Sequence, residues 1–109
     1  MARRVVWTEI AWSDLEAAAD YIAKDSPNYA AAFVREVRDA ARSLAYLAER
    51  GRIAPELDDP SLRELLVRSY RLVSQVTTEA VHIVGFIHGA RDIEALWERE
   101  GRPSSSDTG

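Results

Sequence analysis

The chain of 109 residues (12.2 kDa) is 47% hydrophobic and 29% charged, which fits one globular domain and leaves no apolar run for a membrane span or a signal peptide. The absence of cysteine excludes disulfides, thiolate metal sites and a cysteine nucleophile, and with two histidines we expect no metal and no cofactor. Domains that bind nucleic acid usually carry an excess of basic residues, whereas this chain has a net charge of −4, so any cationic surface must be local.

The chain begins with a pattern typical of a short strand followed by a helix. Residues 3–7 include β-branched and aromatic side chains, which favour a strand. Thr8 can cap the helix that follows, because its hydroxyl can accept a hydrogen bond from a backbone N–H of the first turn. Apolar residues then recur every three or four positions, which predicts a helix over residues 9–24.

A second helix is predicted over residues 27–50. Ser26 is its expected cap, and Pro27 suits the first helical position. The apolar stripe continues to about Glu49 or Arg50, and Gly51 is a natural stop. Two long helices joined by a short turn predict an antiparallel hairpin.

The second half of the chain changes to strand periodicity. Residues 51–61 hold two prolines and are expected to form a loop. Alternating or continuous apolar patterns then predict three strands, at 62–67, 70–76 and 81–87, the last two joined by a hairpin turn. A short helix is expected over 92–100, and the Ser-, Gly- and Pro-containing residues 101–109 are expected to be a disordered tail.

These elements predict one α+β domain over residues 1–100, in the order β-α-α-β-β-β, with an antiparallel sheet packed on the helical hairpin and a short C-terminal helix. Side chains alternate along a strand, so Tyr70 and Leu72 share one face of the sheet while Arg71 and Val73 share the other. Because arginine is rarely buried without a partner, we expect the Arg71 face to be open.

Four segments, in this order and spacing, resemble the RelE/ParE superfamily of bacterial toxins: GRIAPEL at 51–57, RELLV at 63–67, YRLVSQV at 70–76 and VHIVGFIHGARD at 81–92. The resemblance implies the toxin half of a type II toxin–antitoxin module. RelE-like members are ribosome-dependent mRNA endonucleases, whereas ParE-like members poison DNA gyrase. The IHGARD segment resembles the ParE-like branch. Where RelE-like enzymes carry lysines on the strand matching 62–67, this chain has Leu62 and Glu64.

Two arginines are candidate binding residues. Residues 63–91 hold four arginines against two glutamates, so this segment carries the local positive charge. Arg71 lies where the superfamily carries a functional arginine, which in a nuclease would stabilise charge on the phosphate. The alternative is an ion pair, with an antitoxin carboxylate or with Glu64. Arg91 could hold a second phosphate or an acidic protein patch, or form a surface salt bridge with a neighbouring acid.

Two further residues could carry protons if the protein is a nuclease. Glu56 matches a position where some RelE-like enzymes place a general base for the 2′-hydroxyl of RNA; the alternative is a solvated loop carboxylate. His88 could act as general acid or base near neutral pH, or could cap a turn or pack at a strand end.

Aromatic side chains suggest where partners bind. Trp97 and Leu96, on the expected last helix, could anchor a partner. RelE-like enzymes carry a catalytic aromatic residue in this region, and Trp97 lacks its acidic hydroxyl. Trp7 and Trp12 are expected to brace the hairpin on the sheet.

The sequence therefore predicts a cytoplasmic bacterial toxin of the ParE-like branch that inhibits DNA gyrase and supports plasmid stabilization. A cognate antitoxin would neutralise it within a hetero-oligomer. One alternative is a metal-independent, ribosome-dependent mRNA endonuclease that uses Arg71 with Glu56 or His88. Another is a degenerate toxin that only binds its antitoxin.

Overall fold

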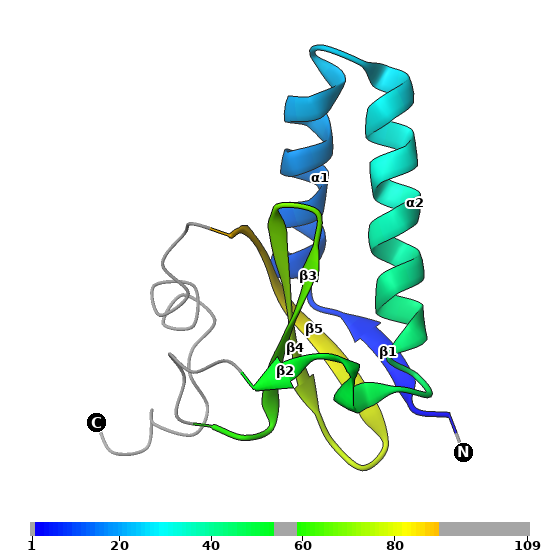
Figure 1. Ribbon diagram of the computed structural model, residues 1–109, viewed down its shortest axis with the longest axis vertical. Coiled ribbons are helices and arrows are strands. Elements are labelled where there is room, and N and C mark those ends of the chain that lie inside the picture. Colours follow the sequence, from blue (N-terminus) through cyan, green and yellow to red (C-terminus); the bar gives the residue numbers. More distant parts are fainter. Residues whose placement is uncertain (1, 54–58, 90–109) are drawn as a thin grey trace.

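The computed structural model describes residues 2–53 and 59–89, which form a helical hairpin beside a five-stranded sheet (Figure 1). The elements in chain order are β1 (Arg4–Trp7), α1 (Glu9–Ala23), α2 (Pro27–Ser43), the 3-10 turn η1 (Ala48–Arg50), β2 (Arg52–Ile53), β3 (Leu62–Val67), β4 (Tyr70–Val76) and β5 (Ala80–His88). The strand order across the sheet is β1-β5-β4-β3-β2. The predicted helix over 92–100 and the predicted tail over 101–109 lie outside the described residues.

The predicted α+β layout is confirmed, with one correction to the sheet. β5, β4, β3 and β2 pair antiparallel in succession, but β1 runs parallel to β5, with Arg4 opposite Ala80 and Trp7 opposite Ile83. The sheet is therefore mixed and not purely antiparallel. Two parallel neighbouring strands need a long connection, and here the helical hairpin and β2 to β4 all come between β1 and β5 in the sequence.

Both helices begin where the sequence predicts. Thr8 Oγ1 accepts a hydrogen bond from the backbone N–H of Ala11 (3.1 Å), and Ser26 Oγ accepts one from Tyr29 (3.1 Å). These bonds satisfy N–H groups that have no partner within the helix. The polar caps thus fix both helix starts.

The second helix ends earlier than predicted, at Ser43 and not near residue 50. Ser43 Oγ donates to the carbonyl oxygen of Ala40 (2.6 Å) and accepts from Arg50 Nη1 (2.8 Å), so the chain folds back into a turn and η1. Leu44 and Ala48 are nevertheless buried. The apolar stripe extends beyond the end of the helix because Leu44 and Ala48 pack into the core from the turn that follows it.

The hairpin packs on one face of the sheet, with α1 against β5 and α2 against β3. Phe33 of α2 contacts the rings of Tyr70 and Phe86, which stack on each other with centroids 4.8 Å apart. A bulge between β4 and β5 places Val73 opposite Gly85 and Ser74 opposite Ile83, which leaves one extra residue on β5. Within the described ranges, no helix is long and apolar enough to cross a membrane.

Candidate functional site

A buried carboxylate joins three strands on the sheet face that points away from the helices. Glu64 of β3 pairs in register with Arg52 of β2 on one side and Val73 of β4 on the other. Glu64 Oε2 accepts a hydrogen bond from Arg52 Nε (2.8 Å), and Arg71 Nη1 lies 3.3 Å from Oε1. The glutamate side chain is 1% exposed, against 18% for Arg71 and 67% for Arg52.

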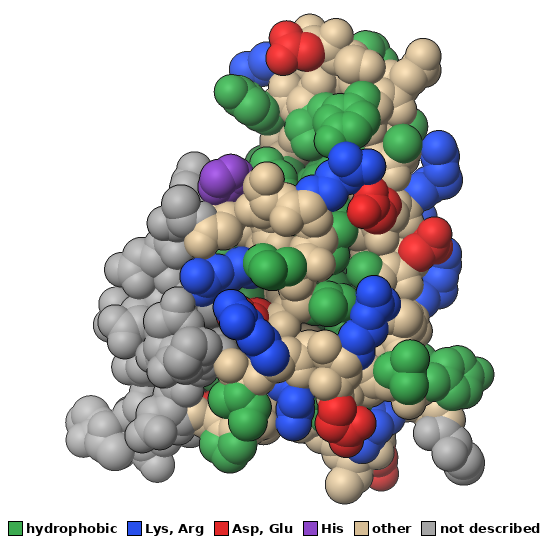
Figure 2. Space-filling view, viewed as in Figure 1, with side chains coloured by type: hydrophobic (Ala, Val, Ile, Leu, Met, Phe, Trp, Pro, Cys, Tyr) green, Lys and Arg blue, Asp and Glu red, His purple; other side chains and the backbone are tan. Residues whose placement is uncertain are grey.

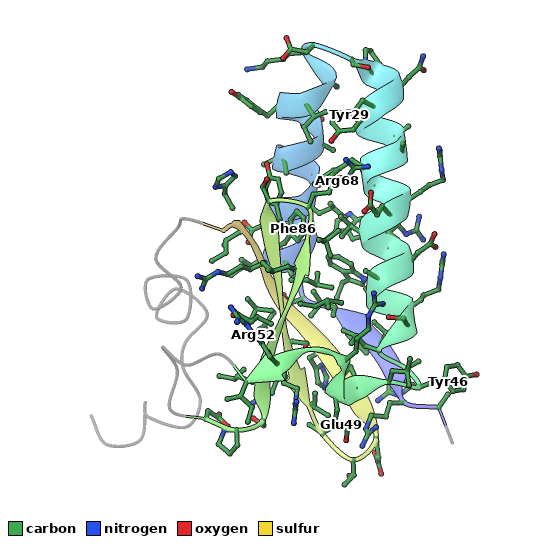
Figure 3. The ribbon with its side chains drawn as sticks, viewed as in Figure 1. Tyr29, Tyr46, Glu49, Arg52, Arg68 and Phe86 are labelled. Carbon is green, nitrogen blue, oxygen red and sulfur yellow. The ribbon has the colours of Figure 1, made fainter. Side chains whose placement is uncertain are left out.

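The two arginines make the burial of this carboxylate tolerable. An ionised carboxylate loses its hydration on burial, and only opposite charges and hydrogen bonds offset that cost. Arg52 of β2, labelled in Figure 3, donates a hydrogen bond to one carboxylate oxygen, whereas Glu64 Oε1 has an ion-pair contact but no hydrogen-bond donor among the described residues. The Arg71 contact is therefore electrostatic, and Glu64 depends on it for its second oxygen.

The structure corrects the expected environment of Arg71. Its predicted face is confirmed, since Arg71 and Val73 lie opposite the core residues Tyr70 and Leu72 in the alternation of β4. The prediction that this face is open is wrong, because Val73 is fully buried and Arg71 is mostly buried. The ion pair with Glu64, one of the alternatives that the sequence left open, makes the burial of the Arg71 charge tolerable.

His88 lies on the opposite face from Arg71. It ends β5 directly across from Tyr70, and its ring meets the Tyr70 ring edge-on with centroids 5.4 Å apart. Tyr70 packs on Phe33 of α2, so this pair belongs to the helix side of the sheet. A pocket of about 550 Å³ lined by His88, Tyr70 and residues of α1 opens there. The structure therefore does not bring His88 and Arg71 to one phosphate.

A groove of about 290 Å³ lies between α2 and β3 (Figure 2), and its lining includes Arg50 and Arg68 together with Glu36 and Asp39. Arg68 Nε donates to Glu36 Oε1 (2.7 Å) and Nη1 donates to the hydroxyl of Tyr29 (2.9 Å). The hydrogen bond to Glu36, with its charge, raises the pKa of Arg68. The groove thus mixes charges of both signs around the exposed Leu66.

Four candidate residues from the sequence, namely Glu56, Arg91, Leu96 and Trp97, lie outside the described residues, and their roles stay predictions. Sequence reasoning missed Arg52, which it placed in a loop. The available signal was the single acid in the strand Leu62–Val67, a position that invites a cationic partner on each neighbouring strand. Across residues 2–53 and 59–89, no three side chains of the metal-binding types converge.

Comparison with known proteins identifies the family. Residues 5–93 match the family described as the ParE toxin of the type II toxin–antitoxin system parDE. The chain belongs to the ParE toxin family. It is the toxin component of a type II toxin–antitoxin module, as the resemblance implied.

One relative and one solved structure are similar to this ParE-family chain. Toxin RelE2 of Caulobacter vibrioides is 43% identical over 89 residues, which cover 81% of this chain and 97% of the relative. The chromosomal ParDE toxin–antitoxin system of P. aeruginosa contains a chain with a similar fold, at a TM-score of 0.66 and 22% identity, covering 80% of this chain and 96% of that one. At that identity, the structural likeness supports the fold.

Proposed function

We propose that this toxin arrests bacterial growth in the cytoplasm by inhibiting DNA gyrase, and that a cognate antitoxin neutralises it by binding its surface. The observation that supports a protein target over RNA is the Arg71–Glu64 ion pair. A nuclease needs the arginine to meet phosphate charge in the transition state. Here a buried carboxylate already faces that guanidinium, and it would repel a phosphate.

The proton carriers of a nuclease are also poorly placed among the described residues. Metal-independent cleavage of RNA needs a base for the 2′-hydroxyl and an acid for the leaving oxygen, both at the same phosphate. His88 faces the helices while Arg71 faces the other side. Glu64 shares the Arg71 face, but at 1% exposure it cannot reach a substrate hydroxyl.

Endonuclease activity is the competing function, because the curated relative carries a name from the RelE branch. The test is induction of the toxin in cells, with colony survival as the first readout. We expect Glu56→Ala and His88→Ala to remain toxic, and removal of residues 92–100 to weaken toxicity. Glu49→Ala, a change at an acid of η1, is the matched control for Glu56→Ala. Each variant is checked for folding by circular dichroism.

Two molecular readouts then separate the targets. Inhibition of gyrase predicts DNA breaks trapped on gyrase in the arrested cells, with mRNA uncut on ribosomes. Removing a positioned acid or base costs a nuclease about 10²–10⁴ in rate. Loss of toxicity in a folded Glu56→Ala or His88→Ala variant, together with ribosome-dependent mRNA cuts by the parent, would overturn the proposal. The antitoxin is tested separately, by co-purification with the product of the adjacent small reading frame.

A further inference from the structure

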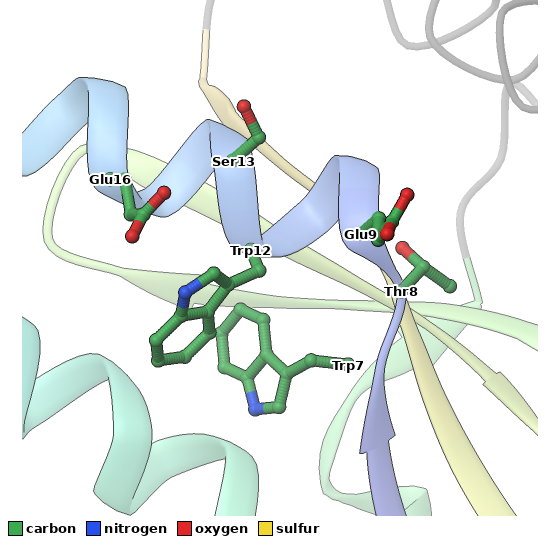
Figure 4. A pocket seen from close by; sticks show the side chains of 6 residues that line it. All are labelled: Trp7, Thr8, Glu9, Trp12, Ser13 and Glu16. Atoms are coloured by element: carbon green, nitrogen blue, oxygen red, sulfur yellow. The ribbon is translucent and has the colours of Figure 1, made fainter.

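An open recess lies where β1 passes into α1, away from the Glu64 cluster. It has a volume of about 570 Å³ and is lined by two tryptophans, two glutamates and two hydroxyl residues: Trp7, Thr8, Glu9, Trp12, Ser13 and Glu16. Figure 4 shows both indoles below α1, with Glu9 and Glu16 on the helix at opposite ends of this stretch. The positions 9, 12, 13 and 16 form one helical stripe beside the buried stripe of Ala11 and Leu15.

The aromatic part of the recess, Trp7 and Trp12, is partly exposed to solvent. Trp7 and Trp12 meet edge-on, with ring centroids 5.4 Å apart, which links β1 to α1 as the sequence predicted. Trp12 is nevertheless 37% exposed. Exposed indoles are uncommon on a surface that meets only water, and tryptophan is enriched where protein surfaces meet.

The two carboxylates of the recess form no ion pair among the described residues. Neither Glu9 nor Glu16 forms an ion pair within the described ranges 2–53 and 59–89, and the lining contributes no cation. Glu9 lies in the first turn of α1, where the helix dipole favours it, but Glu16 is at mid-helix and lacks that compensation. The negative faces of the indoles add to this potential. The recess is therefore built to attract a cation.

The protein itself shows which cation suits these rings. The guanidinium carbon of Arg38, from α2, lies 5.9 Å from the centroid of the Trp12 ring. Guanidinium is planar, stacks on aromatic faces and donates two parallel hydrogen bonds to a carboxylate.

We propose that this recess binds an arginine side chain of a basic segment in a protein partner. Charge complementarity selects that occupant: a nucleic-acid phosphate would be repelled by Glu9 and Glu16, and a neutral apolar side chain would leave both carboxylates unmet. The proposal does not depend on gyrase as the target. It concerns a negatively charged recess at the start of α1, whereas the proposed function was argued from Arg71 on the sheet.

The test is titration of the full-length protein with N-acetyl-arginine amide, observed through the indole N–H signals in ¹H–¹⁵N NMR spectra. Trp12→Phe assigns its own signal by its disappearance. We expect the Trp7 and Trp12 signals to shift and to saturate at concentrations on the order of millimolar, as fits one side chain. The citrulline analogue has nearly the same shape without the charge and should shift them little.

Variants at the carboxylates separate a specific site from general attraction. We expect the double variant Glu9→Gln/Glu16→Gln to weaken arginine binding about tenfold, because the negative charge of the recess is removed. Both side chains are exposed, so the fold should persist. Glu49→Gln removes an acid elsewhere and should leave binding unchanged. Equal shifts with citrulline, no effect of the double variant, or stronger shifts with a DNA oligonucleotide would each overturn the proposal.

Discussion

Glu64→Gln should cost this protein a substantial part of its stability. The variant keeps the shape of the side chain but removes the buried negative charge that lies 3.3 Å from Arg71 Nη1. Removing one partner of a fully buried ion pair costs about 3–5 kcal/mol. Arg52 is mostly solvated and adds little, so we expect a loss of roughly 2–4 kcal/mol in the free energy of unfolding. In a domain of this size that lowers Tm by about 10–20 °C.

Urea unfolding followed by circular dichroism measures this loss, and Glu36→Gln is the matched control. Glu36 pairs with Arg68 at 2.7 Å, a shorter distance than that between Arg71 and Glu64, but both side chains are 46% exposed, so its removal should cost at most about 1 kcal/mol. Adding Arg71→Met to Glu64→Gln completes a double-mutant cycle, whose coupling energy measures how much of the loss belongs to the Arg71–Glu64 pair. Equal losses for Glu64→Gln and Glu36→Gln would refute the reasoning from burial.

Three other changes test the fold. Arg68 has a φ of 55° in the β3–β4 turn, so Arg68→Val should be less stable than Arg68→Gly by roughly 1–2 kcal/mol; equal melting temperatures would contradict the left-handed backbone. Phe33→Ala should cost about 3–5 kcal/mol in urea unfolding, since it empties the contact with Tyr70 and Phe86, and a loss below 1 kcal/mol would count against that cluster. Thr8→Ala should cost about 1 kcal/mol by removing the α1 cap, with Thr8→Ser as the conservative control; equal stability of the two variants would contradict the cap.

The parts of the fold that follow from local chemistry could be predicted from the sequence. Thr8 and Ser26 each lie directly before the first residue of a helix, and the hydroxyl of each caps that helix as predicted. The alternation of side chains around Arg71 correctly predicted which residues share each face of β4, because successive side chains of a strand point to opposite faces. In each case the signal lies within a few residues of its effect.

The parts that depend on distant residues could not be predicted in the same way. β2 consists of two exposed residues that pair with β3. It is too short to show an alternating apolar pattern, so the sequence around it does not predict a strand. The end of α2 at Ser43 was hidden because Leu44 and Ala48 stay buried in a different conformation. Arg71 can be mostly buried because Glu64, on another strand, supplies an opposite charge. The residues next to Arg71 in the sequence do not show which strands pair.

The parallel pairing of β1 with β5 has a consequence for how the chain is made. Arg4 pairs with Ala80, so the edge strand β1, which precedes the helical hairpin in the chain, must wait for β5, which follows β4. The helical hairpin needs only neighbouring residues and can form early, whereas contacts between distant segments are slow to close. We therefore expect an emerging chain to carry its two helices while the sheet beneath them is still open, with the apolar face of the hairpin uncovered until β5 arrives.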